Sequence, residues 1–372
     1  MVLTMIAPCL FGLEAPLAYE AKTLGLQEVR AENGRVCFCG EPADLVRANL
    51  HLRYAERVLL CLGEFEARSF EELFEGVRRL DWQDWIGKKD AFPVKGHAIS
   101  SQLHSVPDCQ AIIKKAVVEK LKTVYHLPWF EETGPRHQIQ FSILKDRVTV
   151  ALDTTGAGLH KRGYRAVSTL APIKETLAAG LLDIARYKPD KPLFDPMCGS
   201  GTFLIEAAMQ AKGIAPGLRR RFAAQEWEQI PAALWTRQRE EAMAKVRSGD
   251  AAPIEGWDID PSAVELARAN AKKAGVDDLI HVSVRDIAAF SSMEARGMAV
   301  TNPPYGERLL DRDAARALYR TMGKVFTKKD GWSYFIISPD EAFEHYFGRP
   351  ADKKRKLYNG MLKCEFFQYF RR

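Results

Sequence analysis

The sequence predicts an α/β protein, with a doubly wound, mostly parallel sheet in its second half and two smaller α+β units before it. Three observations support this prediction. From about residue 169 onward, short apolar runs typical of buried strands alternate with helical segments. A tight glycine turn, Gly199-Ser200-Gly201, joins one of these strands to its helix. Near the C-terminus, Asn359-Gly360 predicts a closing antiparallel hairpin.

The pattern in the first half of the sequence predicts two α+β units. In residues 1–55 we expect strands at 5–10, 28–32 and 35–39 and helices at 15–24 and 42–51, with Asn33-Gly34 as a hairpin turn. In residues 56–156 we expect strands at 57–63, 92–100, 138–144 and 147–153 and helices at 70–80 and 107–125. Residues 157–168 are expected to link these units to the doubly wound half, residues 169–372.

The sequence of the doubly wound half predicts a regular alternation of helices and strands. Helices are expected at 169–185, 203–209, 262–274, 313–326 and 340–347, and strands at 191–194, 254–258, 279–284, 299–301, 332–337 and 364–370. Segment 213–250 is longer than this order needs, so it predicts an insertion or an extra helix.

The glycine turn predicts a cofactor site. Gly199 and Gly201 let the backbone turn sharply and approach a ligand. The turn lacks the third glycine and the Walker lysine that favour pyrophosphate, and the acid before it, Asp195, suits a cationic ligand. S-adenosylmethionine carries a sulfonium and an ammonium, so the turn favours this cofactor. The candidate residues here are Asp195, Pro196, Cys198, Gly199, Ser200, Gly201 and Thr202.

Acidic residues end the next two predicted strands. Asp258 can bind both ribose hydroxyls, and Asp286 can accept from an adenine amine. Each acid alone is more often a helix cap. Together with Asp195, and with Asn302 after the fourth strand, they predict one cofactor cleft. The further cofactor-binding candidates are Asp258, Ile259, Asp286, Ile287 and Asn302.

The tetrapeptide Asn302-Pro303-Pro304-Tyr305 predicts chemistry on an exocyclic base amine. It follows a buried strand and is therefore expected at the carboxyl end of the sheet. A base amine is a poor nucleophile because its lone pair is delocalised into the ring. The Asn302 amide oxygen and the Pro303 carbonyl can each accept one amine hydrogen, the prolines fix φ, and Tyr305 offers a ring to a flipped base. The alternative is a loop with a buried tyrosine.

Three basic segments predict contact with a phosphate backbone. In helix 107–125 the lysines form either a solvated face or a face that follows phosphates. In the linker the basic residues either contact RNA or pair with carboxylates. Insertion 213–250 adds a third group near the predicted cleft. The candidates are Lys114, Lys115, Lys161, Arg162, Arg165, Arg219, Arg220 and Arg221.

Composition bounds the class of protein. The 372 residues suffice for two or three domains, and 47% hydrophobic residues suffice for packed cores. A net charge of +6 permits nucleic-acid binding. No apolar run approaches the roughly 18 residues of a membrane span, and no basic region precedes the apolar N-terminus, so we expect no signal peptide and a cytoplasmic location. The seven scattered cysteines favour reduced thiols over disulfides or a metal site.

With these motifs, the sequence resembles bacterial RNA guanine-N2 methyltransferases that carry an N-terminal ferredoxin-like unit and a THUMP domain. The resemblance covers nearly the whole chain and rests on residues 7–14, 100–121, 160–165, 169–179, 195–206, 258–270 and 302–309. Such proteins are often labelled N6-adenine-specific DNA methylases because of the shared Asn-Pro-Pro-Tyr. Here Gly306-Glu307-Arg308-Leu309 is closer to the guanine-N2 branch.

The resemblance implies a Rossmann-like class I methyltransferase domain with a mostly parallel seven-stranded sheet in residues 169–372, after a ferredoxin-like unit (1–55) and a THUMP domain (56–156). It implies metal-independent methyl transfer from S-adenosylmethionine to a guanosine N2 amine in structured RNA, first of all 23S ribosomal RNA. Thr169 and Pro172 would cover the methionine end of the cofactor. The alternatives are a tRNA guanine-N2 methyltransferase, an adenine-N6 methyltransferase of DNA or RNA, and an RNA-binding assembly factor with a vestigial pocket. The sequence does not indicate an oligomeric state.

Overall fold

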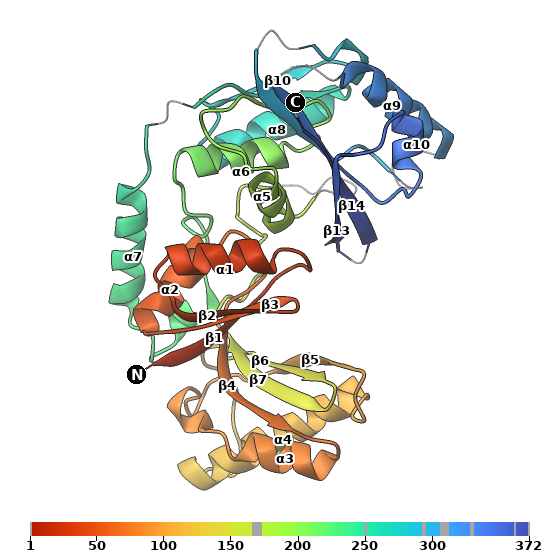
Figure 1. Ribbon diagram of the computed structural model, residues 1–372. Coiled ribbons are helices and arrows are strands. Elements are labelled where there is room, and N and C mark those ends of the chain that lie inside the picture. Colours follow the sequence, from red (N-terminus) through yellow and green to blue (C-terminus); the bar gives the residue numbers. More distant parts are fainter. Residues whose placement is uncertain are drawn as a thin grey trace. The chain divides into compact units, whose positions relative to one another are not determined.

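The chain forms two compact units (Figure 1). The computed structural model describes residues 2–165, 173–248, 251–291, 295–305, 312–327, 331–360 and 362–370, so Thr169, Pro172 and residues 306–309 lie outside the described residues. The first unit consists of Met1–Pro8, Ala18–Leu159 and Arg221–Glu240. The second unit consists of Cys9–Leu17, His160–Arg220 and Glu241–Arg372.

One seven-stranded sheet, in the order β2-β3-β1-β4-β7-β6-β5, runs through the first unit. Its strands are β1 (Leu3–Pro8), β2 (Gln27–Glu32), β3 (Arg35–Gly40), β4 (Leu59–Glu66), β5 (Val94–Ile99), β6 (Ile139–Leu144) and β7 (Arg147–Asp153). Because β1 pairs antiparallel with both β3 and β4, the ferredoxin-like part and the part that follows it share this sheet. The hairpin predicted at Asn33-Gly34 is confirmed.

The helices of the first unit follow the amphipathic pattern of the sequence. They are α2 (Pro42–His51), α3 (Phe70–Arg78) and α4 (Val106–Tyr125), with a short 3-10 turn η1 (Trp82–Asp84), while α1 (Glu14–Thr23) and α7 (Ala232–Ala244) contribute residues to both units. α3 and α4 pack against each other beside strands β4 to β7 (Figure 1). The ferredoxin-like and α+β character predicted for this part of the chain is confirmed.

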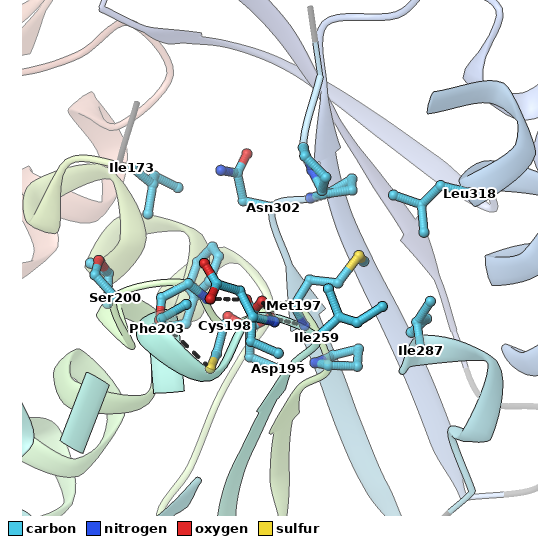
Figure 2. A pocket seen from close by; sticks show the side chains of 18 of the residues that line it. Ile173, Asp195, Met197, Cys198, Ser200, Phe203, Ile259, Ile287, Asn302 and Leu318 are labelled. Atoms are coloured by element: carbon cyan, nitrogen blue, oxygen red, sulfur yellow. Dashed lines mark hydrogen bonds between the residues drawn. The ribbon is translucent and has the colours of Figure 1, made fainter. Parts of the chain in front are cut away.

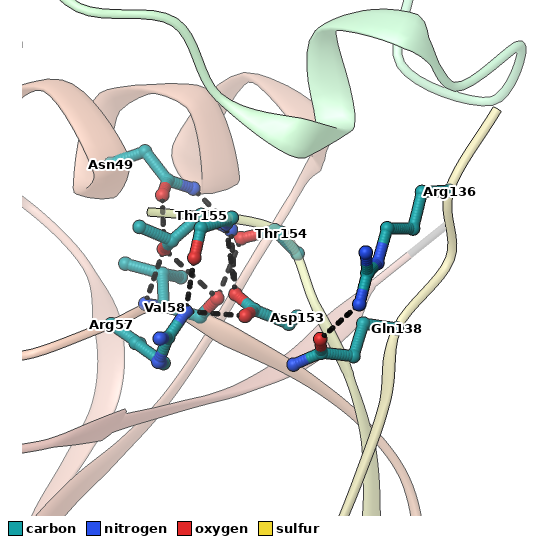
Figure 3. A network of polar contacts seen from close by, with 9 residues as sticks. Asn49, Arg57, Val58, Arg136, Gln138, Asp153, Thr154 and Thr155 are labelled. Atoms are coloured by element: carbon teal, nitrogen blue, oxygen red, sulfur yellow. Dashed lines mark hydrogen bonds and ion pairs between the residues drawn. The ribbon is translucent and has the colours of Figure 1, made fainter. Parts of the chain in front are cut away.

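A buried polar network fixes the junction inside the first unit (Figure 3). Asn49 on α2 donates to the Thr154 hydroxyl at 2.9 Å and accepts from the Thr155 hydroxyl at 2.7 Å. Arg57 pairs with Asp153, at the end of β7, at 2.5 Å. Burial raises the pKa of Asp153, and Arg57 opposes that rise. Because an unsatisfied buried polar group costs about 1–3 kcal/mol, this network favours one arrangement of α2 against β7.

Part of the predicted insertion belongs to the core of the first unit. Segment Arg221–Glu240 contains the 3-10 turn η2 (Ala223–Glu226) and most of α7. The Trp227 ring stacks on His137 with centroids 4.4 Å apart, and its indole N–H donates to the Arg136 carbonyl at 3.1 Å. Trp227 is 2% exposed, so the insertion is a packed element of this unit and not a solvated loop.

The second unit holds a seven-stranded sheet in the order β10-β9-β8-β11-β12-β14-β13. Its strands are β8 (Leu193–Asp195), β9 (Ile254–Asp258), β10 (Ile280–Val284), β11 (Gly297–Thr301), β12 (Trp332–Ser338), β13 (Lys353–Asn359) and β14 (Leu362–Tyr369). Strands β8 to β12 are parallel, and β14 runs antiparallel to both β12 and β13. This confirms the predicted mostly parallel sheet and its closing hairpin.

Helices cover both faces of this sheet, as a doubly wound fold requires (Figure 1). The helices are α5 (Glu175–Ile184), α6 (Thr202–Ala211), α8 (Pro261–Ala274), α9 (Arg312–Val325) and α10 (Phe343–Phe347), with a 3-10 turn η3 (Ile287–Ala289). On β9, a side chain at Gly256 would meet Leu204 of α6. The next residue, Trp257, points to the opposite face, into an aromatic core that includes Phe194, Tyr319 and Trp332.

The N-terminal segment Cys9–Leu17 packs within the second unit. Gly12 has a φ of +94°, and a Cβ there would lie 2.8 Å from Leu357 Cδ2, so the position needs glycine. Arg355 on β13 donates to the Gly12 carbonyl. The ring of Phe11 meets that of Tyr358 edge to face with centroids 6.1 Å apart. Much of the sequence motif at residues 7–14 thus packs against the closing hairpin.

Candidate active site

A cavity of about 440 Å³ lies at the carboxyl ends of the parallel strands of the second unit (Figure 2). β8 has β9 on one side and β11 on the other, so the strand order reverses between β8 and β11. Open α/β sheets bind ligands at this switch point. In Figure 2, Asn302 lies across the cavity from Asp195 and Cys198.

The glycine turn between β8 and α6 is held by hydrogen bonds to the backbone and a side chain of β9. Gly199 and Gly201 have φ values of +50° and +78°, which favour glycine. The Gly199 N–H donates to Asp258 Oδ2 at 2.8 Å, and the Cys198 N–H donates to the Trp257 carbonyl at 2.8 Å. The turn therefore exposes backbone to the cavity in a fixed conformation.

Asp195 places a buried carboxyl at the floor of the cavity. Its exposure is 2%, and its Oδ1 accepts from the Met197 N–H at 3.3 Å. Burial raises the pKa of Asp195 to about 7; the Thr301 hydroxyl and the Met197 amide oppose the rise, and the charge of Asp258 adds to it. The described side chains give this carboxyl no cationic partner, so a cationic ligand would supply the missing countercharge.

The acids that end β9 and follow β10 both cap backbone and line the cavity. Asp258 accepts one N–H on each oxygen, from Gly199 at 2.8 Å and from Asp260 at 3.0 Å. Each oxygen keeps a lone pair for another donor, such as a ribose hydroxyl. Asp286 caps η3 by accepting from Ala288 at 2.7 Å. Capping and ligand binding are thus compatible at these residues.

The Asn-Pro-Pro-Tyr loop forms another wall of the cavity. Among the described residues, none donates a hydrogen bond to the buried Oδ1 of Asn302. The Tyr305 hydroxyl accepts from Asn359 at 3.0 Å, which fixes the far end of the ring. Burial is the main cause that raises the pKa of Tyr305 to about 12, so the phenol is neutral at physiological pH.

The structure brings almost all of the predicted cofactor and base-binding residues to this one cavity. Those that line it are Asp195, Pro196, Cys198, Gly199, Ser200, Thr202, Asp258, Ile259, Asp286, Ile287, Asn302, Pro303, Pro304 and Tyr305. Gly201 shapes the turn but is not among the lining residues; its missing Cβ faces Ala267 on α8. Thr169 and Pro172 lie outside the described residues.

Sequence reasoning missed the apolar walls of the cavity, one acid and one cation. These residues are Ile173, Met197, Phe203, Asp260, Ala263, Arg285, Ala314 and Leu318. Ala314 and Leu318 are four residues apart on α9, a spacing that places both on one helix face and could have indicated them. Arg285 follows β10 directly, and its guanidinium lies 4.9 Å from the centroid of the Trp257 ring.

Several basic residues proposed for RNA contact have internal partners instead. Arg162 is 3% exposed and pairs with Glu206 at 3.3 Å, which leaves its guanidinium almost no surface for a phosphate. Arg165 lies 3.5 Å from Glu175 and donates to the Thr202 hydroxyl at 2.7 Å. This is the carboxylate pairing that the sequence left open for the linker.

The other proposed RNA contacts divide in the same way. Lys114 pairs with Glu132 at 2.5 Å and lies 3.5 Å from the centroid of the Phe92 ring. Arg220 is 8% exposed and donates to the Lys161 carbonyl at 3.2 Å. Arg219 donates to the Lys273 carbonyl. The side chains of Lys115, Lys161, Arg219 and Arg221 remain exposed and available to a phosphate.

The described part of the chain offers no group of three or more His, Cys, Asp or Glu side chains arranged to hold a metal ion. No described helix combines the length and apolar character that crossing a membrane requires. All seven cysteines are free thiols, and five of them are buried.

The residues of the cavity fit S-adenosylmethionine. The buried, unpaired Asp195 suits a cationic ligand, and the oxygens of Asp258 have spare acceptor capacity for ribose hydroxyls. The apolar side chains of Ile173, Phe203 and Leu318 suit the uncharged parts of such a ligand. A phosphate is disfavoured here, because four aspartates and one arginine line the cavity.

The chain matches three known domain families. "RMKL-like, methyltransferase domain" matches residues 162–368, "RlmL ferredoxin-like domain" matches residues 4–59, and "THUMP domain" matches residues 67–153.

Proteins similar to nearly the whole chain are also known. YpsC of Bacillus subtilis (strain 168), provisionally named an RNA methyltransferase, is 43% identical over 369 residues, which cover 99% of this chain and 96% of YpsC. The ribosomal RNA large subunit methyltransferase K/L of Marinomonas sp. (strain MWYL1) is 32% identical over 97% of this chain, which spans 52% of that longer protein. The crystal structure of SMU.472, provisionally called a methyltransferase and complexed with SAH, is 43% identical with a TM-score of 0.93, covering 100% of this chain and 98% of that one.

Proposed function

Because this chain belongs to the RMKL-like methyltransferase family and carries a THUMP domain, it is an S-adenosylmethionine-dependent RNA methyltransferase, and we propose that its target is the N2 amine of a guanosine in large-subunit ribosomal RNA. The observation that supports the site is the placement of Asn302 and Tyr305 on the same cavity as Asp195 and Asp258. A base amine held by the first pair would lie beside a cofactor held by the second.

In the proposed complex, Asp195 faces the cationic end of the cofactor, Asp258 binds the ribose hydroxyls and Asp286 accepts from the adenine amine. When bound, S-adenosylmethionine supplies an electrophilic methyl group. Phe203 and Leu318 exclude water from the cavity. These roles follow from the acceptor capacity of the carboxylates and from the place of each side chain on the cavity wall.

The base-binding side of the cavity would activate the amine by orientation. Asn302 Oδ1, which has no donor among the described residues, accepts one amine hydrogen, and the Pro303 carbonyl accepts the other. These two bonds turn the nitrogen lone pair out of conjugation and toward the cofactor side. The ring of Tyr305 stacks on the everted base. No strong base is required, because the amine becomes acidic and loses a proton once it is alkylated, so catalysis rests on positioning.

Two observations favour guanine N2 and ribosomal RNA over the alternatives. The segment Gly306-Glu307-Arg308-Leu309 resembles the guanine-N2 branch, and the Marinomonas relative is named for large-subunit ribosomal RNA. A tRNA guanine and an adenine N6 amine are the rival targets. The intact set of cavity residues argues against a non-catalytic assembly factor.

Mass spectrometry of nucleosides from a deletion strain tests the proposal. We expect 23S ribosomal RNA from that strain to lose one N2-methylguanosine and a plasmid copy of the gene to restore it. Loss of N6-methyladenosine, or loss of methylguanosine from tRNA alone, would assign the enzyme to a rival target. A plasmid copy with Asn302→Ala is the control for indirect effects, and it should not restore the nucleoside.

A further inference from the structure

A second cavity, of about 740 Å³, lies at the opposite end of the sheet of the second unit. Its lining includes Met298 near the start of β11, Ser333 near the start of β12 and Gln368 near the end of β14. Strand register puts these residues on one face, because Met298 is opposite Ser333 and Phe335 is opposite Gln368. The C-terminal end of α5 borders the same cavity.

This cavity is strongly basic. One carboxylate, Asp183, stands against five cations, which are Arg186, Lys191, Arg296, Lys353 and Arg355. The cations come from separate elements: the end of α5, the approach to β8, the approach to β11, and β13. In the described residues, Arg186, Lys191, Arg296 and Lys353 make no side-chain ion pair, whereas Arg355 donates to the Gly12 carbonyl. Such convergence of five cations around a single carboxylate favours an anionic ligand.

A buried amide adds a donor to this cluster. Gln368 is 3% exposed, and its Nε2 has no hydrogen-bond partner among the described residues. Gln368 is register-paired with Lys353 on β13, so the two side chains leave the sheet on the same face. An unsatisfied buried donor is destabilising, and an acceptor placed beside Lys353 would remove that cost.

We propose that this basic cavity binds a phosphate group of the substrate RNA backbone. Four aspartates line the cofactor cavity, so the RNA that delivers a base there must find its cationic contacts elsewhere. Arg186, Arg296 and Lys353 are exposed, which suits a polymer that passes over the cavity better than an enclosed small anion. The inference rests on RNA as the substrate and is independent of which base is methylated.

Salt-dependent filter binding of the full chain to deproteinised ribosomal RNA tests this inference. In the double variant Arg296→Gln/Lys353→Gln, the slope of log affinity against log salt should fall by about 0.7–0.9 for each phosphate that the protein no longer neutralises. For the one phosphate proposed here, affinity near 0.1 M salt should then fall about five- to eightfold. Lys324→Gln, which removes an exposed lysine on α9, is the matched control and should change neither quantity.

Gln368→Leu separates the buried donor from the charge. This variant should weaken RNA binding without changing the salt slope, because it removes no cation. Affinity for S-adenosylmethionine, measured by calorimetry, should match the wild type in every variant, which checks folding and keeps the result separate from the target assignment. Wild-type affinity and slope in the double variant would overturn the proposal. Stabilisation of the wild type by inorganic pyrophosphate, abolished in the double variant while RNA binding is unchanged, would assign the cavity to a small anion and also overturn it.

Discussion

The amide nitrogen of Asn359 donates a hydrogen bond to the Tyr305 hydroxyl across 3.0 Å. Asn359 is the last residue of β13, at the turn of the closing hairpin, whereas Tyr305 lines the cofactor cavity. The bond therefore holds the ring proposed to stack on the target base from a strand pair at the end of the sheet. It links the closing antiparallel hairpin to the base-binding loop.

Replacing Asn359 should impair transfer without affecting the cofactor. Asn359→Ala removes one bond to Tyr305, so the methylation rate should fall about fivefold, while the Kd for S-adenosylmethionine is unchanged. Rates are measured with ribosomal RNA from a deletion strain. In a Tyr305→Phe background, Asn359→Ala should have no further effect, because its partner is already absent. Additive losses in the double variant would show that Asn359 acts by another route.

Binding of the cofactor should depend on pH through Asp195. Its folded-state pKa is raised to about 7, so in the free protein the carboxyl is mostly neutral below that pH. A cationic ligand favours the carboxylate, so binding must release a proton at low pH. The association constant should fall by up to about tenfold per unit between about pH 7 and 5. Calorimetry with wild type and Asp195→Asn checks this, and the variant should lack the dependence. Equal affinity of the wild type at both ends of that range would contradict the role.

The same raised pKa predicts how pH affects the stability of the free protein. The pKa of Asp195 is higher in the folded state than in the unfolded chain, so the neutral carboxyl contributes stability below the unfolded value, and this contribution is lost as pH rises toward about 7. Cofactor binding should compensate above that pH. The increase in melting temperature on addition of S-adenosylmethionine should therefore be larger near pH 7.5 than near pH 5.5, because the cofactor is expected to bind more tightly at the higher pH.

Alanine at Gly201 tests the glycine turn, and alanine at Gly348 is its matched control. Both have positive φ, +78° and +85°, so alanine at either position should cost about 1–2 kcal/mol of stability. A Cβ at Gly201 would also lie 3.1 Å from the Ala267 Cβ, whereas no atom lies within 4 Å at Gly348. Gly201→Ala should therefore displace the turn and weaken cofactor binding, while Gly348→Ala should not. Calorimetric Kd values for S-adenosylmethionine distinguish the two variants. Equal effects on Kd would show that the turn has no specific role in cofactor binding.

The Asn49 network should stabilise the first unit. Asn49→Ala leaves the buried hydroxyls of Thr154 and Thr155 without one partner each, so the unfolding transition of this unit should lose about 2 kcal/mol. Scanning calorimetry of the full chain measures the change. Gln27→Ala, on the exposed surface of β2, is the control and should stay within about 0.5 kcal/mol. An unchanged transition in Asn49→Ala would show that the network contributes specificity and not stability.

Local signals explain why most elements were predictable from sequence. The Asn-Gly pairs at Asn33-Gly34 and Asn359-Gly360 each encode a hairpin, and the structure has one at each place. The helix expected at residues 42–51 matches α2. The cavity residues were also predictable, because polar groups at the ends of parallel strands converge on one edge of a sheet.

Non-local packing explains what the sequence could not indicate. Trp227 stacks on His137, 90 positions earlier in the chain, so segment 213–250 carries no local sign that part of it packs within the first unit. Arg162 resembles a free basic residue until Glu206 is placed 3.3 Å from it. The basic cavity likewise gathers five cations from four elements that lie far apart in the chain, and of these only the basic run at 353–356 is visible as a cluster in the sequence.

The central claim is that Asn302 orients the target amine and does not hold the cofactor. The most direct measurement is tritiated-methyl transfer by Asn302→Ala to ribosomal RNA from a deletion strain, together with the calorimetric Kd for S-adenosylmethionine. We predict that transfer falls about 100- to 1,000-fold, as for other preorganised hydrogen-bonding groups, with the Kd within about twofold of the wild type. Turnover close to wild type, or a loss explained by cofactor affinity alone, would contradict the account.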